Sequence, residues 1–128
     1  MPHILIIDDE PKVRLMLRKL FESQGYTVTE AADGNEGIKQ YRADPADLII
    51  TDLIMPDKEG METIVELKKD FPDIKIIAMS GGGKFRHTGY LDVAKRLGAL
   101  QTFEKPIRRK ELLDAVSQIV GAPTWNKD

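Results

Sequence analysis

Five side chains of this sequence could take part in chemistry, and each lies at the end of a short apolar run or directly after one. They are Asp8, Asp9, Asp52, Ser80 and Lys105. An ionised carboxylate at the end of a buried strand is costly to desolvate, so such a residue is usually paired or reactive. Asp52 is the clearest case, because an apolar run over residues 48–51 precedes it and Pro56 prevents that strand from continuing.

Together these groups favour phosphoryl transfer. Three carboxylates in one pocket repel one another, so they need a cation, and an all-oxygen ligand set selects a hard ion such as Mg²⁺. Two carboxylates, a backbone carbonyl near Ile54 and water molecules would complete its coordination. The Asp52 carboxylate could attack phosphorus to form an aspartyl phosphate. Mg²⁺, the Lys105 ammonium and the Ser80 hydroxyl could then each bind one oxygen of the phosphoryl group.

The elements that must position these side chains alternate along the chain. Strand-like apolar runs cover residues 3–7, 26–31, 48–51, 74–79 and 100–104, and a segment with helical periodicity follows each of them. Pro11 suits the first turn of the first helix, and Asp33 with Glu36 has the spacing of a capping box that opens the second.

This alternation predicts an α/β fold with a five-stranded parallel sheet, because parallel neighbours need crossovers and right-handed crossovers place helices on both faces. In open sheets of this kind, sites form beyond the carboxyl ends of the strands. All five candidate side chains would therefore meet at one edge of the sheet.

Length and composition limit the remaining possibilities. A chain of 128 residues can bury one core, and we expect a single domain. The net charge of -2 gives no general attraction to nucleic acid or to an anionic membrane, and the absence of Cys excludes disulfides and thiol chemistry. No apolar run approaches the ~18 residues of a membrane span. We expect a cytoplasmic protein with no direct nucleic-acid binding and no membrane insertion.

The pattern resembles the receiver domain of two-component response regulators. The resemblance rests on Asp8 and Asp9 after the first strand, Asp52 followed by Met55, Pro56 and Gly60, Ser80 at the fourth strand, and Lys105 with Pro106 after the fifth. It covers residues 3–121, which leaves a short tail at 122–128 and no output domain. The fold that it implies is flavodoxin-like and doubly wound, with strand order 2-1-3-4-5 and helices on both faces.

The resemblance also implies a mechanism. A histidine kinase or histidine phosphotransfer protein would phosphorylate Asp52 in a reaction that depends on Mg²⁺. Asp9 and Asp52 would bind the metal directly, Asp8 would act through a bound water, and the backbone carbonyl of Ile54 would complete the protein ligands. The phosphoryl group would draw Ser80 toward it and move the glycine-rich loop that follows.

The surface that this switch would affect comprises the helix that ends near Leu97, the fifth strand and the last helix, and we expect an unidentified downstream protein to bind there. Receivers often carry Tyr or Phe three residues before the lysine, where this chain has Thr102. Phe103 is one residue out of register, and neighbouring strand residues point to opposite faces. We expect Phe103 to pack in the core and Thr102 to take a minor part in switching.

Several alternatives stay open at this point. The basic residues on the expected partner surface are either a solvated helix face or a site for an acidic partner. The chain could instead be a phosphate carrier or sink in a phosphorelay. A phosphohydrolase of the aspartyl-phosphate type is a weaker alternative, because such enzymes have a second Asp where this chain has Ile54.

The lifetime of the phosphorylated state should depend on the side chains at two positions that flank the phosphoryl group, because a polar side chain there could orient an attacking water. Ile54 and Gly82 offer no polar side chain to orient an attacking water. We therefore predict slow self-dephosphorylation, and rapid loss of the phosphoryl group from the isolated protein would contradict this.

Overall fold

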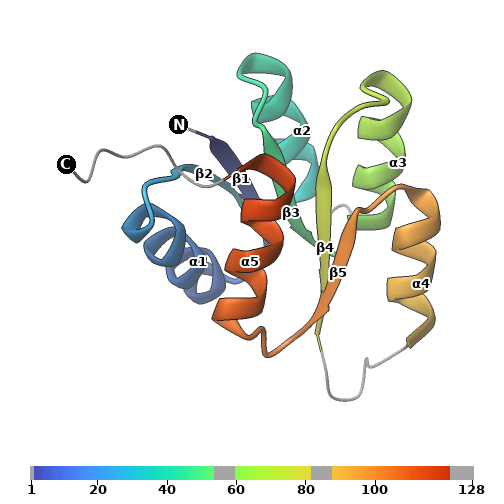
Figure 1. The fold of residues 1–128 in the computed structure, drawn as a ribbon. Helices are drawn as coiled ribbons and strands as arrows, with labels where there is room; N and C mark the ends of the chain where they lie inside the picture. The colour runs from blue at the N-terminus through green and yellow to red at the C-terminus, as the bar shows by residue number, and fades with distance from the viewer. Residues whose placement is uncertain (1, 54–59, 82–87, 122–128) are drawn as a thin grey trace.

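The computed structural model describes residues 2–53, 60–81 and 88–121, with the backbone alone for residues 88–91. Strands and helices alternate along these described residues (Figure 1). In order they are β1 (His3–Ile7), α1 (Pro11–Ser23), β2 (Thr27–Ala31), α2 (Gly34–Ala43), β3 (Leu48–Asp52), α3 (Gly60–Asp70), β4 (Ile76–Ser80), α4 (Thr88–Leu97), β5 (Gln101–Glu104) and α5 (Arg109–Val120).

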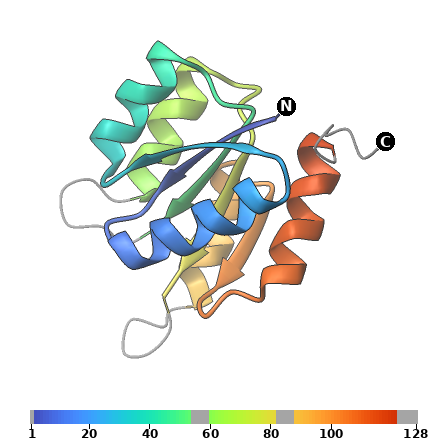
Figure 2. The same cartoon turned by 90° about the vertical axis from the view of Figure 1, so that its left-hand side faces the viewer.

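The strands form one parallel sheet in the order β2-β1-β3-β4-β5. Helices α1 and α5 cover one face, and α2, α3 and α4 cover the other (Figures 1 and 2). The predicted flavodoxin-like fold, its strand order and its two helical layers are confirmed. The order in which strands are added reverses between β1 and β3: β2 lies on one side of β1, and β3, β4 and β5 follow on the other side. In doubly wound sheets, binding sites form at this switch point.

Two apolar clusters hold these layers together, one on each face of the sheet. Leu17 of α1 and Leu112 of α5 pack in one cluster, and Ile38, Ile64 and Ala94 of the other three helices pack in the second. The central strands are buried on both faces, so their sequences are continuous apolar runs rather than alternating ones.

The ends of the elements differ from the sequence predictions by one or two residues, and one difference bears on the site. The fourth strand begins at Ile76 and not at residue 74, because the Ile74 amide donates to the Phe71 carbonyl (3.0 Å) in a turn. The strand instead continues through Ser80, and β3 likewise includes Asp52. Both side chains are therefore held by strand pairing.

The predicted helix starts are present. Pro11 is the first residue of α1, and the Asp33 carboxylate accepts a hydrogen bond from the Glu36 amide (2.8 Å) at the start of α2. In the part of the chain that the structure describes, every helix is too short or too polar to cross a membrane. The domain limits at residues 3 and 121 and the cytoplasmic location stay predictions.

Candidate functional site

The carboxyl ends of four strands bring the predicted site residues together at one edge of the sheet. Asp8 comes directly after β1, Asp52 and Ser80 end β3 and β4, and Lys105 comes directly after β5. Backbone hydrogen bonds fix these ends relative to one another. The Lys105 amide donates to the Ser80 carbonyl (2.8 Å), and the Asp8 amide donates to the Ala31 carbonyl (3.1 Å). The side chains are thus positioned by the sheet itself.

Lys105 lies at the centre of this group and is only 15% exposed. Its Nζ lies 2.9 Å from Oδ2 of Asp8, 3.4 Å from Oδ2 of Asp52 and 3.6 Å from Oε1 of Glu10. Burial alone would lower the pKa of the Lys105 ammonium, but the hydrogen bond to Asp8 and the charges of Asp52, Asp8 and Glu10 outweigh burial and raise that pKa. Lys105 therefore stays charged at neutral pH.

Asp8 is fully buried, and Asp9 beside it is exposed. Burial raises the pKa of the Asp8 carboxyl, and the charge of Asp9 adds to this effect. The Glu10 amide, which donates to Oδ1 of Asp8 (2.9 Å), and the Lys105 ammonium both oppose it. Asp8 therefore depends on its hydrogen bonds and on nearby positive charge to remain ionised.

The three aspartates form a group suited to a hard cation. Asp8, Asp9 and Asp52 each offer a carboxylate oxygen, and these oxygens lie within 4.8 Å of one another. An all-oxygen donor set with several negative charges and one exposed side fits Mg²⁺, which binds few protein carboxylates and keeps several waters. The residues present therefore fit the predicted ion. The Ile54 carbonyl, which we also predicted as a ligand, lies outside the described residues.

Gly60, at the first turn of α3, packs directly on the backbone that carries Asp52. Its amide donates to the Leu53 carbonyl (3.0 Å). A Cβ atom at this position would lie 2.1 Å from the Asp52 carbonyl oxygen and 2.7 Å from the Leu53 Cα. Both are backbone atoms and cannot rotate away, so only glycine allows α3 to approach the end of β3 this closely.

We expect Gly60→Ala to lower the free energy of unfolding by about 2 to 3 kcal/mol, because either β3 or the start of α3 must shift. Urea denaturation measures this change. Gly81→Ala is the matched control, since it also follows a site strand but its Cβ would meet nothing within 4 Å. Equal stability of the two variants would show that the close approach is not required.

The sequence analysis predicted a switching role for Ser80, a minor one for Thr102 and a place in the core for Phe103. Ser80 is buried at the end of β4. Thr102 is half-buried and pairs in register with Ala78, which belongs to the cluster under α2, α3 and α4. Phe103 pairs with Met79 and packs against the opposite cluster, so its predicted place in the core is confirmed. The switching roles of Ser80 and Thr102 stay predictions, and Gly82 lies outside the described residues.

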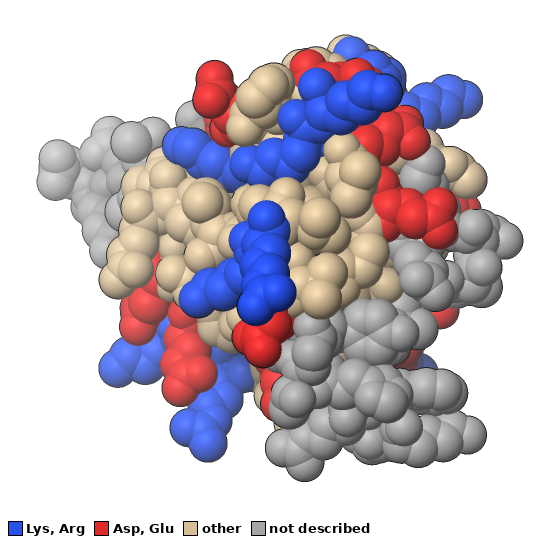
Figure 3. Space-filling model, turned by 90° about the vertical axis from the view of Figure 1, so that its right-hand side faces the viewer, with Lys and Arg blue, Asp and Glu red and all other residues tan. Residues whose placement is uncertain are grey.

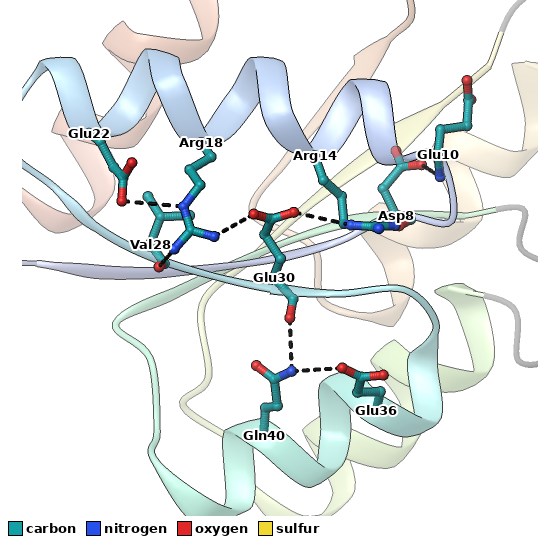
Figure 4. Close-up of polar contacts among 9 residues, drawn as sticks. All are labelled: Asp8, Glu10, Arg14, Arg18, Glu22, Val28, Glu30, Glu36 and Gln40. Atoms are coloured by element: carbon teal, nitrogen blue, oxygen red, sulfur yellow. Dashed lines mark hydrogen bonds and ion pairs between the residues drawn. The ribbon is translucent and has the colours of Figure 1, made fainter.

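Sequence reasoning missed two residues that contact the site. Glu10 contributes a third carboxylate near Lys105, and Arg14 donates from Nη1 to the backbone carbonyl of Asp8 (2.6 Å) (Figure 4). The available signal was their position: both fall within the first six residues after Asp8, where the chain turns from β1 into the first turn of α1.

The expected partner surface, formed by α4, β5 and α5, carries exposed apolar and basic side chains. Val93 and Leu100 are 44% and 45% exposed. The exposed basic residues are Lys95, Arg96, Arg108, Arg109 and Lys110. Figure 3 views the side of the molecule on which α4 lies in Figure 1, and there Lys and Arg side chains lie on a largely uncharged surface. The exposure of these residues is compatible with both a solvated face and an acidic partner. Lys84 and Arg86 lie outside the described residues.

Comparison with known proteins gives consistent matches. Residues 4–117 match the family described as the response regulator receiver domain. The chain is 31% identical to sporulation initiation phosphotransferase F of Bacillus subtilis over 115 residues, 90% of each chain. It is 30% identical to chemotaxis protein CheY of Thermotoga maritima over 117 residues, 91% of this chain and 95% of that protein.

A solved structure with a similar fold is that of response regulator protein TrrA from Thermotoga maritima, described as a complex with Mg²⁺ and BeF. It aligns with a TM-score of 0.82 at 30% identity, and the alignment covers 93% of this chain and 99% of that one.

Proposed function

The chain belongs to the response regulator receiver domain family, and from this premise we propose that Asp52 is the residue that accepts the phosphoryl group. The protein is a phosphorylation-activated switch of a two-component signalling system. The observation that carries the assignment to Asp52 is its place in the site. Its buried carboxylate ends β3, 3.4 Å from the Lys105 ammonium and in a group with Asp8 and Asp9.

The donor in this proposal is a phosphohistidine of a histidine kinase or of a histidine phosphotransfer protein. A carboxylate oxygen of Asp52 attacks the phosphorus atom, so a P–O bond forms while the P–N bond to the imidazole breaks and its electron pair stays with the imidazole. Such a reaction requires alignment and neutralisation of the phosphoryl oxygens rather than further covalent chemistry. Lys105 supplies a fixed positive charge, and the Ser80 hydroxyl donates a hydrogen bond.

Asp8, Asp9 and Asp52 would hold Mg²⁺ in this proposal, with Asp9 and Asp52 as direct ligands, Asp8 acting through water and the Ile54 carbonyl as a further ligand. When bound, the ion supplies positive charge to the oxygens of the phosphoryl group. The Asp group gives this assignment its support, and the TrrA structure is described as a complex with Mg²⁺ and BeF.

Asp9→Asn tests the metal assignment. The exposed position of Asp9 means that the change should leave the core intact, while the loss of one charge should weaken Mg²⁺ binding by at least about 10-fold. Thermal unfolding with and without Mg²⁺ measures this, because an ion that binds only the folded state raises its stability. Asp114→Asn on α5 removes the same charge from an exposed position and should keep the full response. An undiminished Mg²⁺ response in Asp9→Asn would exclude Asp9 as a ligand.

Peptide mapping tests the acceptor assignment. After incubation with a histidine-phosphorylated donor, borohydride should reduce the aspartyl phosphate to homoserine at position 52. Conversion at Asp8 or Asp9, with Asp52 unchanged, would contradict the assignment.

The phosphorylated chain would act through a partner and would not turn over an external substrate. We propose that the downstream protein binds the surface formed by α4, β5 and α5, after Ser80 moves and with a minor contribution from Thr102. The family resemblance supports this location, and Val93 of α4 and Leu100, directly before β5, offer exposed apolar side chains there.

A further inference from the structure

Arg14 connects the candidate metal site to the edge of the sheet. Its side chain lies between α1 and β2 and is 18% exposed. Nη1 donates to the Asp8 backbone carbonyl (2.6 Å), and Nε donates to Oε1 of Glu30 (3.2 Å) (Figure 4). A single planar guanidinium thus joins the backbone at the end of β1 to a carboxylate on β2.

The Glu30 end of this connection is itself held in place. Arg18, one helical turn after Arg14, forms an ion pair with the other carboxylate oxygen of Glu30 and donates from Nη2 to the Val28 carbonyl (3.1 Å). Gln40 of α2 donates to the Glu30 backbone carbonyl (2.8 Å). Figure 4 shows these contacts converging on Glu30 from both sides of β2. Glu30 is therefore a fixed point against which Arg14 can be oriented.

We propose that Arg14 is a positioning residue for the metal site, an inference that rests on the proposed function. The carbonyl that Arg14 binds belongs to the peptide unit between Asp8 and Asp9. Rotation of this unit would change the direction in which the Asp9 side chain leaves the backbone. On the Asp8 side, the Glu10 amide already fixes the carboxylate (2.9 Å). Arg14 adds the constraint on the shared peptide unit, so that both carboxylates point toward Asp52 before the ion binds.

The guanidinium of arginine is required for this role. The two hydrogen bonds come from different nitrogens of one rigid plane, and a lysine ammonium on a flexible stem cannot reproduce that geometry. Arg18 lies on the same helix and binds the same carboxylate, but its backbone contact is to Val28, away from the site. The two arginines therefore differ mainly in whether they contact the chain at Asp8.

Isothermal titration of the unphosphorylated full chain with Mg²⁺ tests this. We expect Arg14→Met to raise the Kd for Mg²⁺ about 10-fold, and Arg14→Lys to remain several-fold weaker than the native chain. Arg18→Met is the comparison variant and should raise the Kd by clearly less than Arg14→Met does, because it loosens Glu30, which Gln40 still holds, without removing the contact to Asp8. Urea denaturation of each variant measures the stability loss separately, and we expect similar losses for the two Met variants.

Equal Mg²⁺ affinity in Arg14→Met and Arg18→Met would overturn the inference, as would full affinity in Arg14→Lys. Arg14→Lys keeps most of the packed side chain, so it decides the question if Arg14→Met does not fold. If the native chain and Asp9→Asn bind Mg²⁺ equally, the proposed metal site fails first, and the role of Arg14 fails with it. If only Asp9→Asn loses affinity while both arginine variants keep it, the metal site stands and the inference alone is wrong.

Discussion

Replacing Lys105 with Met is expected to slow phosphorylation of Asp52 about 100-fold while tightening Mg²⁺ binding. The rate should fall because the Lys105 ammonium, 3.4 Å from Oδ2 of Asp52, is the fixed positive charge nearest to the attacking carboxylate among the described residues. The Mg²⁺ affinity should rise because the same ammonium partly neutralises Asp8, Asp52 and Glu10. Initial rates with a small phosphodonor at saturating Mg²⁺, together with calorimetric titration, measure the two effects.

The opposite directions of these effects separate the role of Lys105 from general damage to the fold. A variant that is merely distorted would lose both metal affinity and rate. Lys110→Met on α5 is the control, since Lys110 is exposed and should change neither quantity. A native phosphorylation rate in Lys105→Met would remove Lys105 from the mechanism.

The architecture could be predicted from the sequence because each element carries its own signal. The central strands are buried on both faces, so they are continuous apolar runs, and Pro11 and Asp33 mark helix starts. Crossover geometry then restricts the sheet to a parallel arrangement, and the family resemblance supplied the strand order. The start of β4 was placed two residues too early because the apolar run already includes Ile74, which is buried but bonded into a turn.

The set of candidate site residues was also predictable, since parallel strands collect the residues at their carboxyl ends. The sequence could not predict how these side chains are placed relative to one another or how deeply each one is buried. The central position of Lys105 between Asp8 and Asp52 depends on side-chain packing. So does the contrast between a buried Asp8 and an exposed Asp9, which are adjacent in the sequence.

Arg14 and Glu30 illustrate the limit of sequence reasoning. They are 16 residues apart and on different elements, and each would ordinarily be interpreted as a surface charge. Only the packing of α1 against β2 shows that they form a chain of contacts leading to Asp8. Gly60 is a similar case. The sequence pattern includes this glycine, but only the structure shows that the start of α3 lies too close to the Asp52 backbone to leave room for a Cβ atom.

Asp52→Asn is expected to abolish phosphorylation completely while preserving the fold. Asparagine has nearly the same shape as aspartate but lacks the nucleophilic carboxylate. The change also removes one of three mutually repelling carboxylates, and Lys105 keeps its 2.9 Å contact with Asp8. The free energy of unfolding without Mg²⁺ should therefore be no lower than that of the native chain. A clear loss of stability would mean that any missing phosphorylation reflects misfolding.

The most direct test of the central claim is the intact mass of the protein after incubation with a small-molecule phosphodonor, with and without Mg²⁺, for the native chain and for Asp52→Asn. We predict one phosphoryl adduct on the native chain, formed only with Mg²⁺, and none on Asp52→Asn under either condition. An adduct of the same yield on folded Asp52→Asn would contradict the assignment of Asp52 as the phosphoryl acceptor.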